Sequence, residues 1–123
     1  MEPLFIYLTI AKRQYEDIRF AGYYNVGPDD SDCVTTGELV SLFCKFWGEG
    51  AKWENKAEKN APHEANFLKL DSSKIKDVFG YKPRWHIDEC ISMTVRFSKV
   101  MRDGGDIPQE MDEEIRIFVS NKG

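Results

Sequence analysis

The sequence has 123 residues, a formal net charge of −4, 41% hydrophobic residues and 13% aromatic residues. This length and composition are typical of one globular domain, which buries roughly 65% of the surface that its unfolded chain exposes, and they exclude an intrinsically disordered protein. Acidic and basic residues are interspersed, whereas a nucleic-acid-binding protein would carry a basic stripe. We therefore expect no nucleic-acid partner.

The sequence contains no pattern that we would expect of a targeting or membrane segment. The apolar run after Pro3 is short, is preceded by the acidic Glu2 and is followed by no small-residue cleavage site, so a signal peptide is not predicted. No run reaches the roughly 20 apolar residues of a membrane span. We expect a cytoplasmic protein that binds no membrane.

The three cysteines give no sign of a disulfide framework or a zinc site. Cys33, Cys44 and Cys90 are odd in number and widely spaced, and no CxxC pair occurs. We expect reduced thiols, with Cys44 and Cys90 acting as small apolar residues of helices, and no bound metal.

Residues 3–17 are predicted to form the first helix, because proline is favoured at a first helical position. Its apolar residues spread around much of the circumference; they are Leu4, Phe5, Tyr7, Leu8, Ala11 and Tyr15. A helix with this distribution normally lies between two layers.

Short β-type runs predict strands at residues 21–27, 51–55 and 66–70. The acidic run 28–32 lies after the first of these. It resembles a calcium loop only superficially, because the alternating ligands fail at Val34 and no glycine stands where such a loop must turn. We predict a solvated turn.

The clearest local signal predicts a helix over residues 35–47. Thr35 and Glu38 have the spacing of a capping box, Val34 and Leu39 that of a hydrophobic staple, and Gly48 is a typical helix stop.

Three further helices are expected in the second half of the chain. Asp71 is predicted to cap a short helix that ends at Gly80, and a long amphipathic helix is predicted over residues 87–101. A last helix comes after the break at residues 104–108. The predicted fold is therefore a mixed, helix-rich α/β domain with about five helices and three short strands.

A motif search by itself gives no function. The sequence contains no GxGxxG, GxxGxxG, GxxxxGK[ST], GxSxG or HExxH pattern, and no tyrosine is followed four residues later by lysine. His86 stands at a helix start, where a capping neighbourhood is favoured over catalysis. His63 lies beside Glu64 in a polar loop, for which a solvated loop is favoured over a catalytic site.

Several stretches nevertheless occur in an order and spacing that resembles the CDP-glucose 4,6-dehydratases, members of the extended short-chain dehydrogenase/reductase family of sugar-nucleotide enzymes. The similarity runs from Glu2 to about Met101. The "LDSSK…FGYKPRW" element is shared by many sugar-nucleotide epimerases and dehydratases, whereas "WGEGAKWE" followed by "PHEA" indicates the CDP-glucose enzymes. The other matching stretches are "EPLFIYLTIAKRQYED", "YYNVGPDD", "VTTGELVSLF" and "IDECISMTV".

The resemblance implies that residues 1–123 correspond to the C-terminal substrate-binding domain of such an enzyme, without its N-terminal Rossmann domain. The intact family, expected as homo-oligomers, uses NAD to convert CDP-glucose to CDP-4-keto-6-deoxyglucose, a step of deoxysugar biosynthesis for the O-antigen of lipopolysaccharide. The family's Gly-rich NAD loop and Tyr-x-x-x-Lys pair have no counterpart in this sequence. We therefore expect this chain alone to bind no NAD and to be inactive, with a sugar nucleotide and the Rossmann domain as its partners.

The resemblance also implies a substrate-binding site, with His63 and Glu64 as its residues. In related enzymes the loop before the D-x-[ST]-K element has the form Arg-Pro-x-[Asp/His]; Pro62 matches the proline, and Glu64 falls on the ribose-contacting position. His63 is the second expected contact. The position of the pyrophosphate-binding arginine holds Ala61, so Lys59 or the Rossmann domain must meet that charge.

Two alternatives remain open. The chain could be a non-catalytic, stand-alone nucleotide-binding or interaction domain, or the same domain from a related epimerase or dehydratase that takes another nucleotide. In the resembling enzymes the first helix packs between the domains. Without that cover we expect residues 3–17 to expose apolar surface, with self-association or reduced stability as the result.

Overall fold

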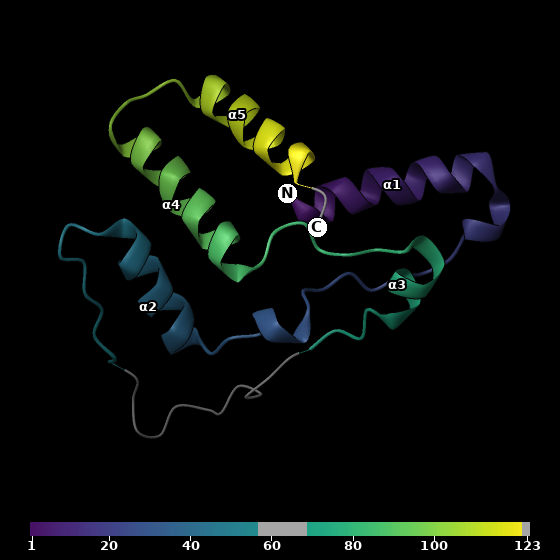
Figure 1. Cartoon of the computed structure of the whole chain (residues 1–123), viewed down its shortest axis with the longest axis horizontal. Coiled ribbons are helices and arrows are strands. Elements are labelled where there is room, and N and C mark those ends of the chain that lie inside the picture. The colour runs from purple at the N-terminus through teal and green to yellow at the C-terminus, as the bar shows by residue number, and fades with distance from the viewer. Residues whose placement is uncertain (57–68, 122–123) are drawn as a thin grey trace.

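The computed structural model describes residues 1–56 and 69–121, and all regular structure in those ranges is helical (Figure 1). The helix-rich character predicted from the sequence is confirmed. None of the helices in these ranges is long and apolar enough to cross a membrane. The α-helices are α1 (Glu2–Glu16), α2 (Thr36–Trp47), α3 (Ser73–Phe79), α4 (Ile87–Arg102) and α5 (Ile107–Ser120), and the short 3₁₀ turns are η1 (Ile18–Phe20) and η2 (Asp30–Asp32).

The prediction of three short strands is wrong for the part of the chain that the structure describes. Residues 21–27 and 51–55 form no strand, nor do Lys69 and Leu70 at the end of the third run, whose other residues lie outside the described ranges. A β-type side-chain pattern favours extended backbone, but a strand also needs a neighbour about 4.8 Å away to pair its amides and carbonyls. No such neighbour is found among the described residues.

The helix boundaries agree closely with the sequence signals. The Thr35 hydroxyl accepts the Glu38 N–H at 3.3 Å, and the Glu38 carboxylate accepts the Thr35 N–H at 2.8 Å, so the capping box is confirmed. Gly80 ends α3 in the left-handed region, with φ 61° and ψ 29°, where glycine carries no Cβ penalty. The start of α3 differs slightly: Ser72 is the N-cap residue, and Asp71 accepts the Ser73 N–H at 2.9 Å.

A small core lies between α1, α3 and the segment directly after α3. Ile6, Ile75 and Tyr81 are buried at its centre. Phe79 extends this core, because its ring contacts those of Phe20 and Tyr24 with centroids 5.3 and 5.0 Å apart. The other residues packed against the core are Ile10 and Val26.

The remaining helices form a second group, in which α4 packs against both α2 and α5. Phe118, near the end of α5, joins the two groups because its ring contacts Trp85 and Phe5 of α1, with centroids 5.1 and 5.6 Å apart. The N-terminal turn of α1 therefore lies against the C-terminal turn of α5 (Figure 1).

Helix α1 buries one face and exposes another that is also apolar. Ile6 is 2% exposed, whereas Leu4 and Leu8 are 64% and 73% exposed. Tyr7 and Tyr15 are exposed as well. The expectation that this helix presents more apolar surface than one layer covers is confirmed.

Candidate functional site

The residues predicted to bind the sugar nucleotide lie in a segment that the structure does not describe. His63 and Glu64, with Ala61, Pro62 and Lys59, fall within residues 57–68. Their role therefore stays a prediction. The first described residue after this segment is Lys69, and its ion pair leads to the acidic segment 29–32.

The acidic segment 29–32 connects three separate parts of the chain. Asp30 pairs with Lys69 at 3.3 Å, and Asp29 pairs with Lys76 of α3 at 2.5 Å. Asp32 lies against the start of α4, where one carboxylate oxygen is 2.8 Å from Nδ1 of His86. The carboxylates of segment 29–32 thus hold together Lys69, helix α3 and the start of helix α4.

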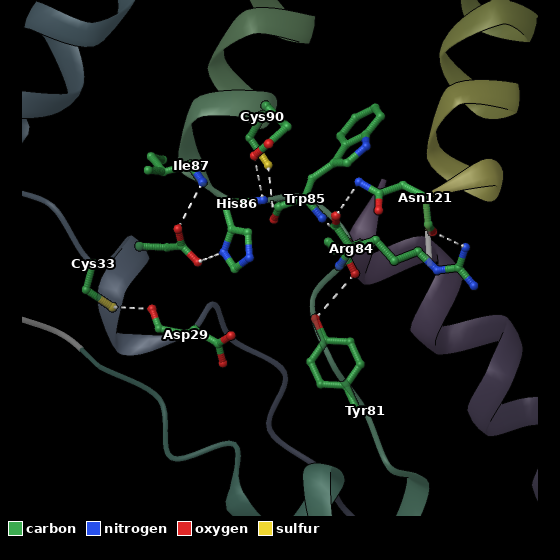
Figure 2. Close-up of polar contacts among 12 residues, drawn as sticks. Asp29, Cys33, Tyr81, Arg84, Trp85, His86, Ile87, Cys90 and Asn121 are labelled. Atoms are coloured by element: carbon green, nitrogen blue, oxygen red, sulfur yellow. Dashed lines mark hydrogen bonds and ion pairs between the residues drawn. The ribbon is translucent and has the colours of Figure 1, made fainter. Parts of the chain in front are cut away.

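The prediction of a solvated turn is wrong at Asp32, which is 8% exposed. Its carboxylate accepts the Ile87 N–H at 3.0 Å, one of the free amides at the N-terminus of α4 (Figure 2). Such amides and the positive end of the helix dipole favour a buried carboxylate. Asp30, in contrast, is exposed as predicted.

His86 stands at the N-cap position of α4, as predicted. Its backbone N–H is accepted by the Glu89 carboxylate at 3.0 Å. The hydrogen bond with Asp32 is the main cause that raises the pKa of His86, with a smaller contribution from the Asp32 charge. A histidine that holds its proton more firmly is less suited to act as a general base and better suited to clamp α4 against the segment 29–32.

An open cleft of about 420 Å³ lies beside this clamp. Tyr81 is part of its wall, and burial, followed by the Glu2 carboxylate, raises the pKa of Tyr81 to about 12, so the phenol is neutral. The Tyr81 hydroxyl donates to the Glu2 carboxylate at 3.4 Å, so the polar groups that the cleft presents are the paired charges of Asp29 and Lys76. Its lining residues are Asp29, Lys76, Asp77, Gly80, Tyr81, Lys82, Pro83 and His86.

Within the described ranges, Asp29, Asp32 and His86 form the group whose ligand atoms could surround a metal ion, all within 4.8 Å of one another. Each of them already has a strong partner: Lys76 for Asp29, and His86 together with the Ile87 N–H for Asp32. The Lys76 ammonium also adds positive charge that opposes a cation. The geometry favours a structural clamp over a metal site.

The sequence analysis did not identify the polar network around Arg84. Its guanidinium donates to the carbonyls of Phe118, Val119 and Asn121, at 3.3, 3.0 and 2.8 Å. The Glu2 carboxylate accepts the Arg84 backbone N–H at 2.6 Å. Figure 2 shows Arg84 beside Asn121. No local pattern in the sequence reveals that Arg84 has partners near both ends of the chain.

Comparison with known proteins gives one informative relationship. The chain is 36% identical over 121 residues to the CDP-glucose 4,6-dehydratase of Salmonella typhimurium, and the alignment covers 98% of this chain. The chain is a relative of CDP-glucose 4,6-dehydratase. The resemblance seen in the sequence is thereby confirmed, and with it a relationship to the sugar-nucleotide dehydratases. No protein-family model matches the chain.

The chain is much shorter than this relative. It spans about a third of the Salmonella CDP-glucose 4,6-dehydratase, 33% of its length. The relationship covers nearly all of this chain, including the segment that carries His63 and Glu64.

Proposed function

We propose that this chain is the C-terminal, sugar-nucleotide-binding part of a CDP-glucose 4,6-dehydratase, with CDP-glucose or a related sugar nucleotide as its ligand. The observation that carries the proposal is the 36% identity with the Salmonella dehydratase over 98% of the chain. In this proposal the oxidation, elimination and reduction steps belong to a Rossmann domain that binds NAD. The chain alone is inactive and binds no NAD.

The ligand's ribose contacts Glu64, with His63 beside it. A carboxylate can accept hydrogen bonds from two vicinal hydroxyls at once, and bonds to a charged acceptor are stronger than neutral ones. His63 can donate to a phosphate or hydroxyl oxygen from its ring. Ala61 stands where related enzymes hold an arginine, so the pyrophosphate charge requires another cation, such as Lys59.

The described residues next to the proposed site are held by ion pairs. Lys69 is close in sequence to the proposed site and is paired with Asp30, which lies next to Asp29 on the cleft wall.

Titration of the isolated chain with CDP, dTDP, UDP and GDP, followed by NMR chemical shifts, tests the proposal. We expect shifts centred on residues 61–66 with CDP and weaker ones with the other nucleotides. Glu64→Gln should weaken CDP binding roughly tenfold, the equivalent of about 1.4 kcal/mol. Glu58→Gln, which removes the same charge from the same loop, should leave binding unchanged.

The possible results separate the candidate functions. Equal binding of another nucleotide would indicate a related epimerase or dehydratase. Absence of shifts with every nucleotide would contradict the proposed site in this chain. Shifts that Glu64→Gln and Glu58→Gln reduce equally would show that only the loop's charge matters.

A further inference from the structure

The only Asp-Gly dipeptide of the sequence, Asp103-Gly104, lies in the turn between α4 and α5. In such a pair the glycine amide nitrogen can attack Cγ of the aspartate side chain. Glycine favours this attack because it carries no side chain that shields its amide, and because its backbone turns freely. Both residues are exposed, and the Asp103 side chain is 60% exposed. The dipeptide is therefore open to the reaction and to the water that completes it.

The reaction rearranges the main chain without any co-reactant except water. The Gly104 nitrogen forms a bond to Cγ of Asp103, and the hydroxyl of the protonated carboxyl group leaves with the amide proton as water. A second water then opens the cyclic succinimide. Opening at the side-chain carbonyl restores aspartate, whereas opening at the main-chain carbonyl leaves the chain joined through Cγ, which is isoaspartate. No oxidant, cofactor or enzyme takes part.

The end of α4 engages the attacking nitrogen. Gly104 has φ 69°, and its N–H donates to the Met101 carbonyl at 3.3 Å. The next N–H, of Gly105, donates to the Val100 carbonyl at 2.9 Å. Two such bonds around a left-handed glycine form a Schellman motif. With ψ 5° at Asp103, its Cβ and the Gly104 nitrogen are rotated far apart about the Cα–C bond. Ring closure brings them together, so the motif must open first.

Arg102 restrains the carboxylate under attack. Its guanidinium donates from Nε to Oδ1 of Asp103 at 2.7 Å and from Nη2 to Oδ2 at 3.2 Å. These hydrogen bonds are the main cause that lowers the pKa of Asp103. An ionised carboxylate reacts poorly, because it lacks the proton with which its oxygen leaves as water. Arg102 is itself held in place by Glu49 at 3.3 Å and by the Trp47 ring, whose centre lies 5.2 Å from the guanidinium carbon.

We propose that Asp103 is a site of spontaneous isoaspartate formation, and that the Schellman motif and the Arg102 guanidinium together suppress the reaction while α4 keeps its last turn. The product does not fit this turn. Isoaspartate adds one carbon to the main chain, whereas even a Cβ added at Gly105 would lie 2.8 Å from Cγ1 of Val100. The modification therefore prevents the turn from closing again. No ligand takes part, so the inference does not rest on the proposed function.

Incubation of the folded chain and of the chain unfolded in urea, both at the same mildly acidic pH, tests the proposal. Digestion after glutamate residues releases position 103 in one peptide, and electron-transfer fragmentation in the mass spectrometer distinguishes isoaspartate from aspartate. Unfolding should speed isoaspartate formation at position 103 roughly tenfold, because two main-chain hydrogen bonds no longer have to open.

Arg102→Met should speed the reaction roughly threefold in the folded chain, the effect expected from loss of an exposed ion pair, and should leave the rate in urea unchanged. Arg116→Met is the matched control: it removes an exposed arginine of α5 that pairs with Glu113, so both rates should stay as in wild type. Asp103→Ser should abolish the signal, which assigns it to this position. Circular dichroism of each variant shows whether its helices are formed.

Three results would overturn the proposal. Absence of isoaspartate at position 103 in urea would show that Asp103 is not a site of the reaction. Equal rates in the folded and unfolded chain would show that the end of α4 does not suppress it. A rate for folded Arg102→Met no higher than that for Arg116→Met would remove the role of the guanidinium. The comparison of folded with unfolded wild type needs no variant, so it decides the matter even where Arg102→Met does not fold.

Discussion

His86 and Asp32 are the residues in which a sequence signal and a long-range contact meet. His86 was expected at a helix start, and it stands there. Asp32 is its partner across a separation of 54 residues. A capping position depends on residues within one turn and is readable from sequence, whereas Asp32 is identified only once the chain brings the segment 29–32 against α4.

The Asp32–His86 pair predicts a pH dependence of stability. The pKa of His86 is raised above 6.5 in the folded protein, so the folded state binds this proton more tightly than the unfolded chain. The contribution of the pair to the free energy of unfolding is therefore complete below about pH 6.5 and is lost as the pH rises through the folded-state pKa. Urea unfolding across this range should show stability falling with rising pH.

His86→Gln provides the comparison. The difference in unfolding free energy between wild type and His86→Gln should be largest at acidic pH and should shrink as the pH rises. Asp32→Asn should likewise remove the pH dependence, since it removes the carboxylate that raises the pKa of His86. A constant difference at all pH values would show that the imidazole acts without its charge.

The predicted ligand residues illustrate a different limit. His63 and Glu64 were chosen from a resemblance, not from local physics, because a polar loop with a histidine and a glutamate is common without a ligand. They lie outside the described residues, so geometry does not bear on them. Their support is the similarity to the dehydratase, and the nucleotide titration is their test.

Among elements, helix α2 tests how much of its stability is local. Thr35→Ala removes the hydroxyl that accepts the Glu38 N–H and the donor to the Glu38 carboxylate. Loss of such a cap typically costs about 1 kcal/mol of unfolding free energy. Thr36→Ala is the control, because Thr36 is the exposed neighbour inside the helix, and we expect a change within about 0.5 kcal/mol. Equal effects in chemical unfolding would show that the capping box does not stabilise α2.

The helices could be predicted because their signals are local, and the strands could not because strand pairing is not. The capping box at Thr35 and the helix-ending glycines Gly48 and Gly80 each depend on residues within one helical turn. Residues 21–27 have the composition of a strand, yet the structure uses them differently: the Tyr23 carbonyl accepts the Lys74 ammonium at 3.0 Å, and the Asn25 side chain donates to the Asp71 carbonyl at 3.3 Å. This segment therefore contacts the start of α3 and the residue before its N-cap through single side-chain hydrogen bonds instead of a strand ladder.

At the scale of the whole molecule, one question is whether the α1–α3 group and the α2–α4–α5 group unfold together. Arg84 stands at their junction. Its guanidinium lies 4.2 Å from the centre of the Phe5 ring of α1 and donates to three carbonyls at the end of α5. The Glu2 carboxylate adds bonds to the Arg84 and Trp85 amides. These contacts predict one cooperative unit.

Arg84→Met tests this prediction, because methionine keeps much of the apolar stem and removes every donor. Hydrogen bonds from a charged group contribute about 1.5–3 kcal/mol, so we expect a loss of roughly 2 kcal/mol in urea unfolding. Hydrogen exchange should speed up in α1 and α5 together.

Arg116→Met is the control, since Arg116 pairs with Glu113 at the surface, where ion pairs contribute about 1 kcal/mol or less. Equal losses in the two variants, or faster exchange in α5 alone, would mean that the two helix groups are stable independently of this junction.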